Sequence, residues 1–240
     1  MRRIVGGVFQ SLDGVIQAPG GPTEDPTGGF QHGGWLPQFF DEEVGRAIDR
    51  LFAQPYDLLL GRRTYEIFAA YWPYVGRETT DMGETFERAG SGDGDADAAA
   101  MGDAFTQANK YVLTRGTPDL GWANSHRIEG LESLRALKQG EGADMIVQGS
   151  STLYPQLLAE GLIDQLTVMT FPVVLGEGKR LFGDGTPARS LRMTDSKVTP
   201  NGAVIATYEP GDAPEHGWAG PQTTSARETE RQRRMAEGSW

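Results

Sequence analysis

The chain has 240 residues, of which 38% are hydrophobic and 9% aromatic, so it can build a core for one large domain or two small ones. It contains no cysteine, which excludes a disulfide framework, thiolate metal ligands and a cysteine nucleophile. Its net charge of −11 argues against a general nucleic-acid binder, and it requires that any anionic ligand meets local positive charge.

The sequence gives no indication of a metal site or a membrane segment. Its histidines, His32, His126 and His216, are far apart and lack the spacing of paired ligands. The first apolar run is short and broken by glycines, unlike a signal peptide, and no later run is long enough to span a bilayer. We therefore expect a cytoplasmic protein that binds a small molecule and neither nucleic acid nor a membrane.

The first elements in chain order are a strand, a long loop and a helix. Apolar residues over Ile4–Gln10 predict a strand, and SLDG at 11–14 is a turn signal. Residues 17–34 are rich in Gly, Pro and Thr, and loops of this length inside a domain are usually functional or disordered. The spacing of apolar residues from Asp41 to Ala53 predicts a helix that Asp41 caps.

A second strand and helix follow, and then an acidic stretch. The continuous apolar run Asp57–Gly61 is typical of a strand buried on both faces, and Thr64–Tyr71 is predicted as a short helix that stops before Pro73. Residues 76–104 are acidic, glycine-rich and of low complexity, so we expect an exposed loop insertion there. The closing glutamate of an EF-hand is missing from this stretch, which argues against a calcium loop.

The rest of the domain is predicted to alternate strands with helices and to end in a hairpin. The predicted strands are Lys110–Thr114, 127–129, 144–148, 164–175, 190–197 and 203–208, and the predicted helices are 131–138 and 152–160. The sequence Pro200-Asn201-Gly202 is a strong turn signal between the last two strands. This order indicates an α/β fold with a mostly parallel sheet and an antiparallel C-terminal hairpin.

The domain is expected to span residues 1–210. Residues 211–240 form a polar tail rich in Arg and Glu, in which RETERQRRMAE is compatible with a helix of alternating charge. Two interpretations of the tail stay open: a solvated extension, or a segment that docks through Trp218 or Trp240.

Two glycine turns point to phosphate binding. An apolar run ends in QGSS at 148–151 and opens a helix, and at such turns backbone N–H groups and the helix dipole point at an anion. The second turn, GRRT at 61–64, also follows a predicted strand. The alternatives are that Ser150 and Ser151 only cap a helix and that the arginines are surface charge.

With these turns placed, the chain resembles the dihydrofolate reductase superfamily, and more closely the branch of the RibD C-terminal domain, the reductase domain of bacterial riboflavin biosynthesis. The resemblance rests on five blocks in the family's order: SLDGVI at 11–16, GGWLP at 33–37, LLLGRRTYE at 58–66, YVLTR at 111–115 and VQGSSTLYPQLLAEGLIDQLTV at 147–168. Together they extend over residues 3–209. The resemblance implies a three-layer fold whose central sheet binds NADPH across the ends of its strands.

The resemblance also implies roles for particular residues. Gly61 would let the main chain approach the cofactor, Thr64 would donate to the pyrophosphate, and Arg115 would hold the 2′-phosphate. Leu153 and Tyr154 would lie beneath the nicotinamide or ribose. The full set of implied cofactor-binding residues is Ile16, Gly61, Arg62, Arg63, Thr64, Thr114, Arg115, Gln148, Gly149, Ser150, Ser151, Thr152, Leu153 and Tyr154.

The N-terminal loop is implied to form the substrate side, with Gln17 at the nicotinamide and Trp35 as a wall. The implied substrate-binding residues are Gln10, Asp13, Trp35, Phe39 and Arg46. Asp41 and Asp13 are the catalytic candidates, although Asp13 alternatively only caps its turn. Dihydrofolate reductases carry a carboxylate near the position of Phe39, and Asp41 lies slightly further along the chain.

The substrate of the riboflavin branch is a ribose phosphate, which needs basic residues beside the pocket. Arg46, Arg50, Lys179 and Arg180 are the candidates for that role. The sequence thus predicts an NADPH-dependent reductase that transfers hydride to a C=N or C=O bond of a small pterin- or pyrimidine-like heterocycle. The alternatives are a non-catalytic or regulatory NADP-binding relative and an unrelated flavin protein. A homodimer is implied by the resemblance.

Overall fold

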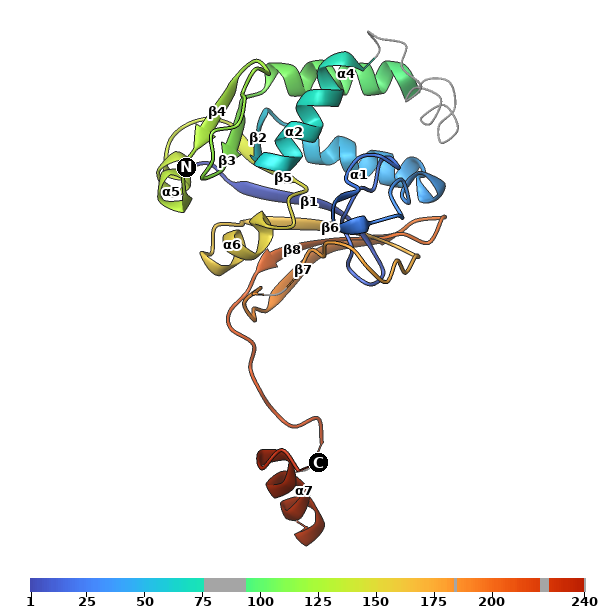
Figure 1. Ribbon diagram of the computed structural model, residues 1–240, viewed down its shortest axis with the longest axis vertical. Helices are drawn as coiled ribbons and strands as arrows, with labels where there is room; N and C mark the ends of the chain where they lie inside the picture. Colours follow the sequence, from blue (N-terminus) through green and yellow to red (C-terminus); the bar gives the residue numbers. More distant parts are fainter. Residues whose placement is uncertain (76–93, 184, 221–224, 240) are drawn as a thin grey trace.

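In a computed structural model, the chain forms an 8-stranded sheet with the order β4-β3-β2-β5-β1-β6-β8-β7 (Figure 1). The structure describes residues 1–75, 94–183, 185–220 and 225–239. Its strands are β1 Ile4–Ser11, β2 Tyr56–Gly61, β3 Lys110–Leu113, β4 Ser125–Ile128, β5 Asp144–Gln148, β6 Gln165–Phe171, β7 Leu191–Val198 and β8 Val204–Pro210. Neighbouring strands from β4 to β6 pair in parallel, and β8 pairs antiparallel with both β6 and β7. The predicted fold class is therefore confirmed.

Helices cover both faces of the sheet. They are α1 Glu42–Phe52, α2 Arg62–Tyr71, α4 Gly94–Gln107, α5 Leu131–Gln139, α6 Leu153–Ala159 and α7 Ala226–Ala236, with short 3-10 helices η1 Thr27–Gly29, η2 Pro37–Phe39 and η3 Trp72–Tyr74. In Figure 1, α1, α2 and α4 lie on one side of the sheet and α5 and α6 on the other. This gives the three-layer arrangement that the resemblance implies.

Alternate residues of the central strands point into different cores. Leu59 of β2 packs in the core beneath α6, together with Tyr154 and Leu157. Its neighbours Leu58 and Leu60 pack instead on the α2 and α4 side. A third cluster lies between α1 and the β6–β8 half of the sheet. A strand buried on both faces reads as a continuous apolar run, as β2 does.

The predicted loop insertion at 76–104 is wrong from residue 94 onward, where α4 forms. Phe105 of α4 is fully buried in the core that α4 shares with α2. Gly102 sits against η3 so closely that a Cβ there would lie 2.4 Å from the carbonyl oxygen of Trp72. The alanine-rich run favours a helix, and this propensity outweighs the acidic, glycine-rich composition. Residues 76–93 lie outside the described residues.

The predicted strand 164–175 is also too long, because β6 ends at Phe171. Pro172 follows immediately and has no N–H to donate to a neighbouring strand. The chain then turns, and Val173 accepts a hydrogen bond from the N–H of Leu12 at 2.7 Å. Residues 172–175 therefore leave the sheet and line the turn that follows β1.

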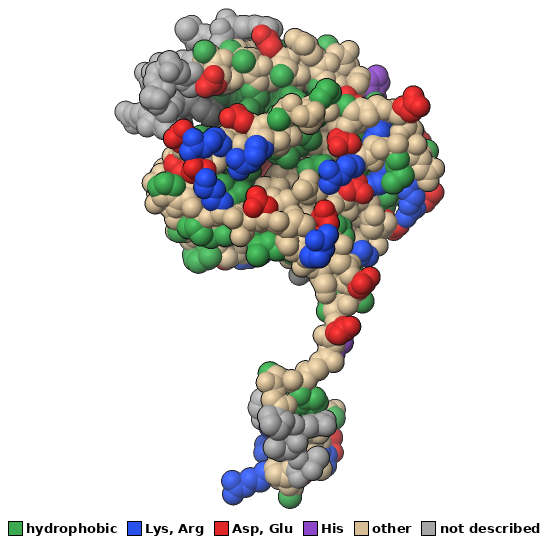
Figure 2. Space-filling model, turned by 180° about the vertical axis from the view of Figure 1, so that it is seen from behind, with side chains coloured by type: hydrophobic (Ala, Val, Ile, Leu, Met, Phe, Trp, Pro, Cys, Tyr) green, Lys and Arg blue, Asp and Glu red, His purple; other side chains and the backbone are tan. Residues whose placement is uncertain are grey.

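The polar tail carries the predicted helix, α7. Ser225 caps it by accepting from the N–H of Glu228 at 3.1 Å, and Glu230 pairs with Arg233 at 2.7 Å within the helix. Figures 1 and 2 show α7 apart from the globular body, at the end of an extended segment.

Within the described part of the chain, we find no helix with the length and apolar character needed to cross a membrane.

Candidate functional site

The candidate site lies where β2, β5 and β1 end. These strands are neighbours in the sheet and run parallel, so their carboxyl ends meet at one edge. The turns that follow them are GRRT at 61–64, QGSS at 148–151 and SLDG at 11–14. In open α/β sheets, ligands bind at this edge. The tertiary structure thus brings together three turns that are far apart in the sequence.

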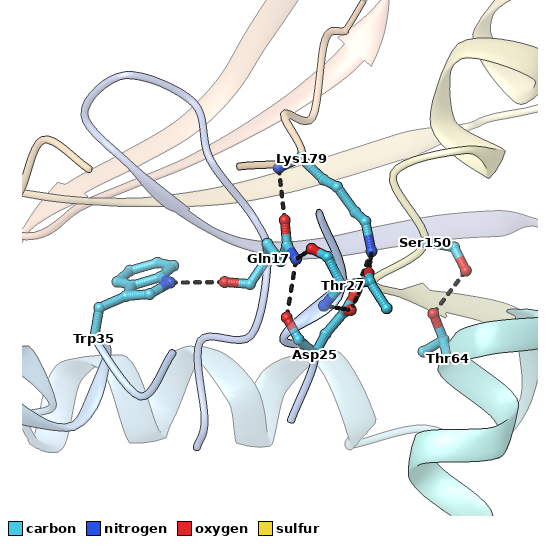
Figure 3. Close-up of polar contacts among 7 residues, drawn as sticks. All are labelled: Gln17, Asp25, Thr27, Trp35, Thr64, Ser150 and Lys179. Carbon is cyan, nitrogen blue, oxygen red and sulfur yellow. Dashed lines mark hydrogen bonds and ion pairs between the residues drawn. The ribbon is translucent and has the colours of Figure 1, made fainter. Parts of the chain in front are cut away.

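Ser150 ties the two phosphate-type turns to each other. Its Oγ accepts a hydrogen bond from the N–H of Gly61 at 3.0 Å and lies 2.7 Å from Oγ1 of Thr64 (Figure 3). Ser150 has a φ of 71° and follows Gly149 with a φ of 84°. A left-handed serine is strained, and such strain persists only where its surroundings hold it. Here those hydrogen bonds to the 61–64 turn hold it.

The contact leaves no room for a side chain at position 61. A Cβ on Gly61 would lie 2.4 Å from Oγ of Ser150 and 3.2 Å from its Cβ. Glycine is therefore needed for the approach of the two turns, not for its backbone angles. The result is a surface of main-chain groups and hydroxyls at the end of two parallel strands, which suits a phosphate or pyrophosphate.

The arginines around this surface differ in their partners. Arg62 forms an ion pair with Glu66 of its own helix at 2.8 Å, whereas Arg63 lines a cleft and has no ion pair with any described residue. Arg115 at the end of β3 is exposed and likewise has no side-chain partner among the described residues. Thr114 uses its Oγ1 to accept from the N–H of Gly116 at 3.1 Å. Arg63 and Arg115 are therefore available to a ligand.

Two predicted cofactor residues belong to the core instead. Tyr154 is fully buried, donates its hydroxyl to the carbonyl oxygen of Val147 at 2.8 Å, and has its pKa raised by burial. Leu153 is only 3% exposed and packs in the same core. Tyr154 has no surface that a ligand could contact, so its predicted position beneath the nicotinamide or ribose is wrong. Leu153 lies next to Gly61, where its Cγ would be 3.6 Å from a Cβ at that position, and for this residue the position stays a prediction. Tyr154 lies under β1, where Gly6 makes room for it.

The other predicted cofactor residues lie at the edge of the sheet. Ile16 is almost completely buried next to the turn after β1. Gln148 and Ser151 are partly accessible and Thr152 is exposed. These positions are compatible with main-chain contacts to a ligand at the 148–151 turn.

Gln17 holds the loop between β1 and α1 in place through a side chain that is almost fully buried. Its Nε2 donates to the carbonyl oxygens of Asp25 and Thr27, both at 2.9 Å, and its Oε1 accepts from the N–H of Lys179 at 3.0 Å. The indole N–H of Trp35 donates to the Gln17 carbonyl at 3.0 Å (Figure 3). Gln17 therefore fixes the long loop onto the segment after β6.

A cleft of about 390 Å³ opens between these loops and the start of α2. It is lined by Gln17, Thr27, Gly28, Phe30, Arg63, Glu177, Gly178 and Lys179. The ammonium group of Lys179 is paired with Asp25 and donates to Oγ1 of Thr27 at 2.7 Å. The sequence did not single out Asp25, Thr27 or Glu177, because nothing in their local pattern shows which loops face each other.

Asp13 fastens the turn after β1 to the loop after β6. It accepts hydrogen bonds from the Ser11 hydroxyl at 2.6 Å and from the N–H groups of Leu175 and Gly176 at 3.1 and 2.9 Å. Partial burial raises the pKa of Asp13, but these hydrogen bonds outweigh it and lower the pKa to about 2. The alternative that Asp13 caps its turn is thus the one the contacts support, and its catalytic role has no support in this geometry.

Asp41 is the N-cap of α1, as predicted. Its Oδ1 accepts from the N–H groups of Glu43 and Val44 at 3.1 and 3.0 Å, and its Oδ2 accepts from the N–H of Asn201 at 3.1 Å. Burial raises its pKa, yet the hydrogen bonds prevail and hold the pKa below the ordinary value. A carboxylate held in its charged form by its cap is a poor proton donor, which counts against the predicted catalytic role.

The remaining substrate-side predictions divide into packing and surface residues. Trp35 is 4% exposed and contacts Phe171, and Phe39 packs on the same ring. Gln10 donates to Oγ1 of Thr170 at 2.9 Å on the neighbouring strand. The contacts of Arg46 give no support to its predicted substrate contact, which stays a prediction. Its guanidinium pairs with glutamates of its own helix, at 2.5 and 2.6 Å, and lies on the solvated face of α1.

Known proteins share both the sequence pattern and the fold. The family described as the RibD C-terminal domain matches residues 2–206. Two uncharacterized proteins of Bacillus subtilis (strain 168) are similar: YyaP is 26% identical over 212 residues, covering 86% of this chain and 94% of its own, and YwjB is 27% identical over 204 residues, covering 82% and 91%. A solved structure of a putative riboflavin biosynthesis protein from Shewanella sp. PV-4 has a TM-score of 0.55 at 17% identity, covering 88% of this chain and 99% of that one.

Proposed function

The chain belongs to the RibD C-terminal domain family, and from this premise we propose that it is an NADPH-dependent reductase of a small heterocycle. The observation that carries the proposal is the joining of two phosphate-type turns by Ser150, with Arg63 beside them, whose guanidinium has no ion pair within the described residues. The family membership supports a reductase-type function. When bound, NADPH would supply the hydride, and the protein would supply position and electrostatics.

One half of the site would bind the cofactor and the other half the substrate. The main-chain N–H groups of the first turn of α2 and the hydroxyl of Thr64 would hold the pyrophosphate, with Arg63 balancing its charge. Arg115, at the end of the next strand outward, would meet the 2′-phosphate. The cleft beside Gln17 and Lys179 would take the substrate. Because the Gln17 network fixes this cleft in advance, little ordering would be needed on binding.

Titration of the full-length protein with NADPH, followed by calorimetry or fluorescence, tests the cofactor part of the proposal. Arg63→Ala should weaken binding roughly tenfold, because a charge-assisted hydrogen bond to phosphate is lost. Arg62→Ala is the matched control: its guanidinium is occupied by Glu66, so its affinity should change less. No binding at concentrations well above micromolar would refute the proposal.

A second candidate function is a non-catalytic NADP-binding protein of the same fold. The specific observation in its favour is that both predicted catalytic carboxylates, Asp13 and Asp41, are occupied by structural hydrogen bonds. NADPH oxidation should be followed in the presence of a panel of pterins, pyrimidines and cyclic imines. Tight NADPH binding without turnover on any of them would favour the non-catalytic candidate.

A further inference from the structure

The cleft carries charged side chains of unequal availability. Those that line it are Arg63, Glu177 and Lys179. The charge of Lys179 is balanced by its ion pair with Asp25, and its ammonium group also donates to the hydroxyl of Thr27. Arg63 is the second residue of α2, in the 61–64 turn that the proposed function assigns to the cofactor phosphates. The only uncommitted charge that lines the loop side, among the residues described, is therefore the carboxylate of Glu177.

The nearby Arg180 does not alter this balance. Its Nε donates to the carbonyl oxygen of Asp13 at 3.0 Å, and its guanidinium also donates to the carbonyl oxygen of Gly176 at 3.0 Å. It thus braces the two turns on which the cleft depends. A phosphate ester in the cleft would have to be desolvated without a free cation on the loop side, which is costly. The charges thus disfavour a phosphorylated substrate.

Glu177 is itself exposed and has no ion pair in the described part of the chain, yet the segment that carries it is fixed on both sides. Before it, the N–H of Gly176 donates to Asp13 at 2.9 Å; after it, the N–H of Lys179 donates to Gln17 at 3.0 Å. Gly178, with a φ of 117°, fits so tightly that a Cβ there would lie 2.7 Å from Cγ1 of Val15. Glu177 therefore stands at a defined position with a carboxylate that no described residue uses.

An ionised carboxylate accepts hydrogen bonds and donates none, so its natural partner is a group with N–H donors or positive charge. On the premise of the proposed function, we propose that the substrate is an unphosphorylated heterocycle whose N–H donors are bound by Glu177. A carboxylate beside a C=N nitrogen also favours its protonated form. When bound, NADPH would supply the hydride to the carbon, and the product would be the neutral amine because Glu177 would already hold the proton on the nitrogen.

The test uses two probes, benzamidine as an N–H donor and inorganic phosphate as the anion, on full-length protein saturated with NADPH. Saturation blocks the pyrophosphate surface, so that phosphate reports only on the substrate side. Benzamidine should bind the wild type, and Glu177→Gln should weaken it roughly tenfold, as expected for loss of a charged hydrogen-bond partner. Glu141→Gln, an exposed glutamate on the turn between α5 and β5, is the control and should leave binding unchanged.

Three results would overturn the proposal: no benzamidine binding to the wild type at millimolar concentration, equal affinity in Glu177→Gln, or phosphate binding at least as tight as that of benzamidine. Thermal unfolding of both variants shows that they fold. NADPH binding is measured first and separately. If NADPH fails to bind, the proposed function fails, and the benzamidine titration of the free protein still tests the role of Glu177.

Discussion

Replacing Gly61 by alanine tests whether the two phosphate-type turns are joined as the structure has them. The new Cβ would lie 2.4 Å from Oγ of Ser150, closer than atoms of real side chains approach. The hydroxyl can move aside only by giving up its contacts with the Gly61 N–H and with Thr64. At roughly 0.5–1.5 kcal/mol for each hydrogen bond, Gly61→Ala should lower the free energy of unfolding by about 1–3 kcal/mol.

The decisive measurement is a double-mutant cycle with Ser150→Gly. This change removes both atoms that the new Cβ would meet most closely, which leaves Cγ of Leu153 at 3.6 Å as the next contact. Glycine also removes the steric strain of the left-handed backbone at position 150, which offsets the lost hydrogen bonds. Ser150→Gly alone should therefore be nearly neutral, and Gly61→Ala combined with it should be clearly more stable than Gly61→Ala alone.

Thermal or urea unfolding of the four proteins provides the free energies. For a chain of this size, about 1 kcal/mol corresponds to a shift of roughly 2–4 °C in Tm, so the effect of Gly61→Ala is measurable. A coupling energy of about 1 kcal/mol or more between the two positions is expected. A double variant as unstable as the sum of both single variants would refute the contact between the turns.

Three further predictions concern single side chains. The pKa of Asp13 is about 2 in the folded protein against an ordinary 3.8, so the stabilisation by its carboxylate is complete above about pH 4 and is lost as the pH falls towards 2. In urea unfolding, the free energy of unfolding should therefore fall less between pH 7 and pH 3 in Asp13→Asn than in the wild type, and an equal fall would contradict the role of its contacts. Arg115→Ala should weaken NADPH binding roughly tenfold and leave NADH binding almost unchanged in calorimetric titrations, whereas an equal loss for both would place the 2′-phosphate elsewhere. Lys110→Met should destabilise the fold by about 1–3 kcal/mol, because Nζ of Lys110 donates to the carbonyl oxygens of Phe105 and Thr106, both at 2.8 Å; unchanged chemical denaturation would show that these bonds contribute nothing.

The family resemblance found in the sequence is confirmed. It could be recognised from the sequence for a physical reason. Turn chemistry is local: a glycine after a buried strand, a small-residue turn before a helix and an aspartate before a helix can all be recognised from neighbouring residues. The GRRT turn at 61–64, the QGSS turn at 148–151 and the cap at Asp41 were recognisable in this way. The predicted order of strands and helices followed from the same local patterns.

The sequence by itself thus determined the fold class, the family and the two phosphate-type turns, because these depend on short-range patterns. Only the tertiary structure decided what each polar side chain contacts. It placed Tyr154 in the core and paired the guanidinium of Arg46 with a glutamate of its own helix. It also showed that Ser150 joins two turns and that Glu177 at the cleft has no partner among the residues that the structure describes, since both depend on segments that meet only after folding.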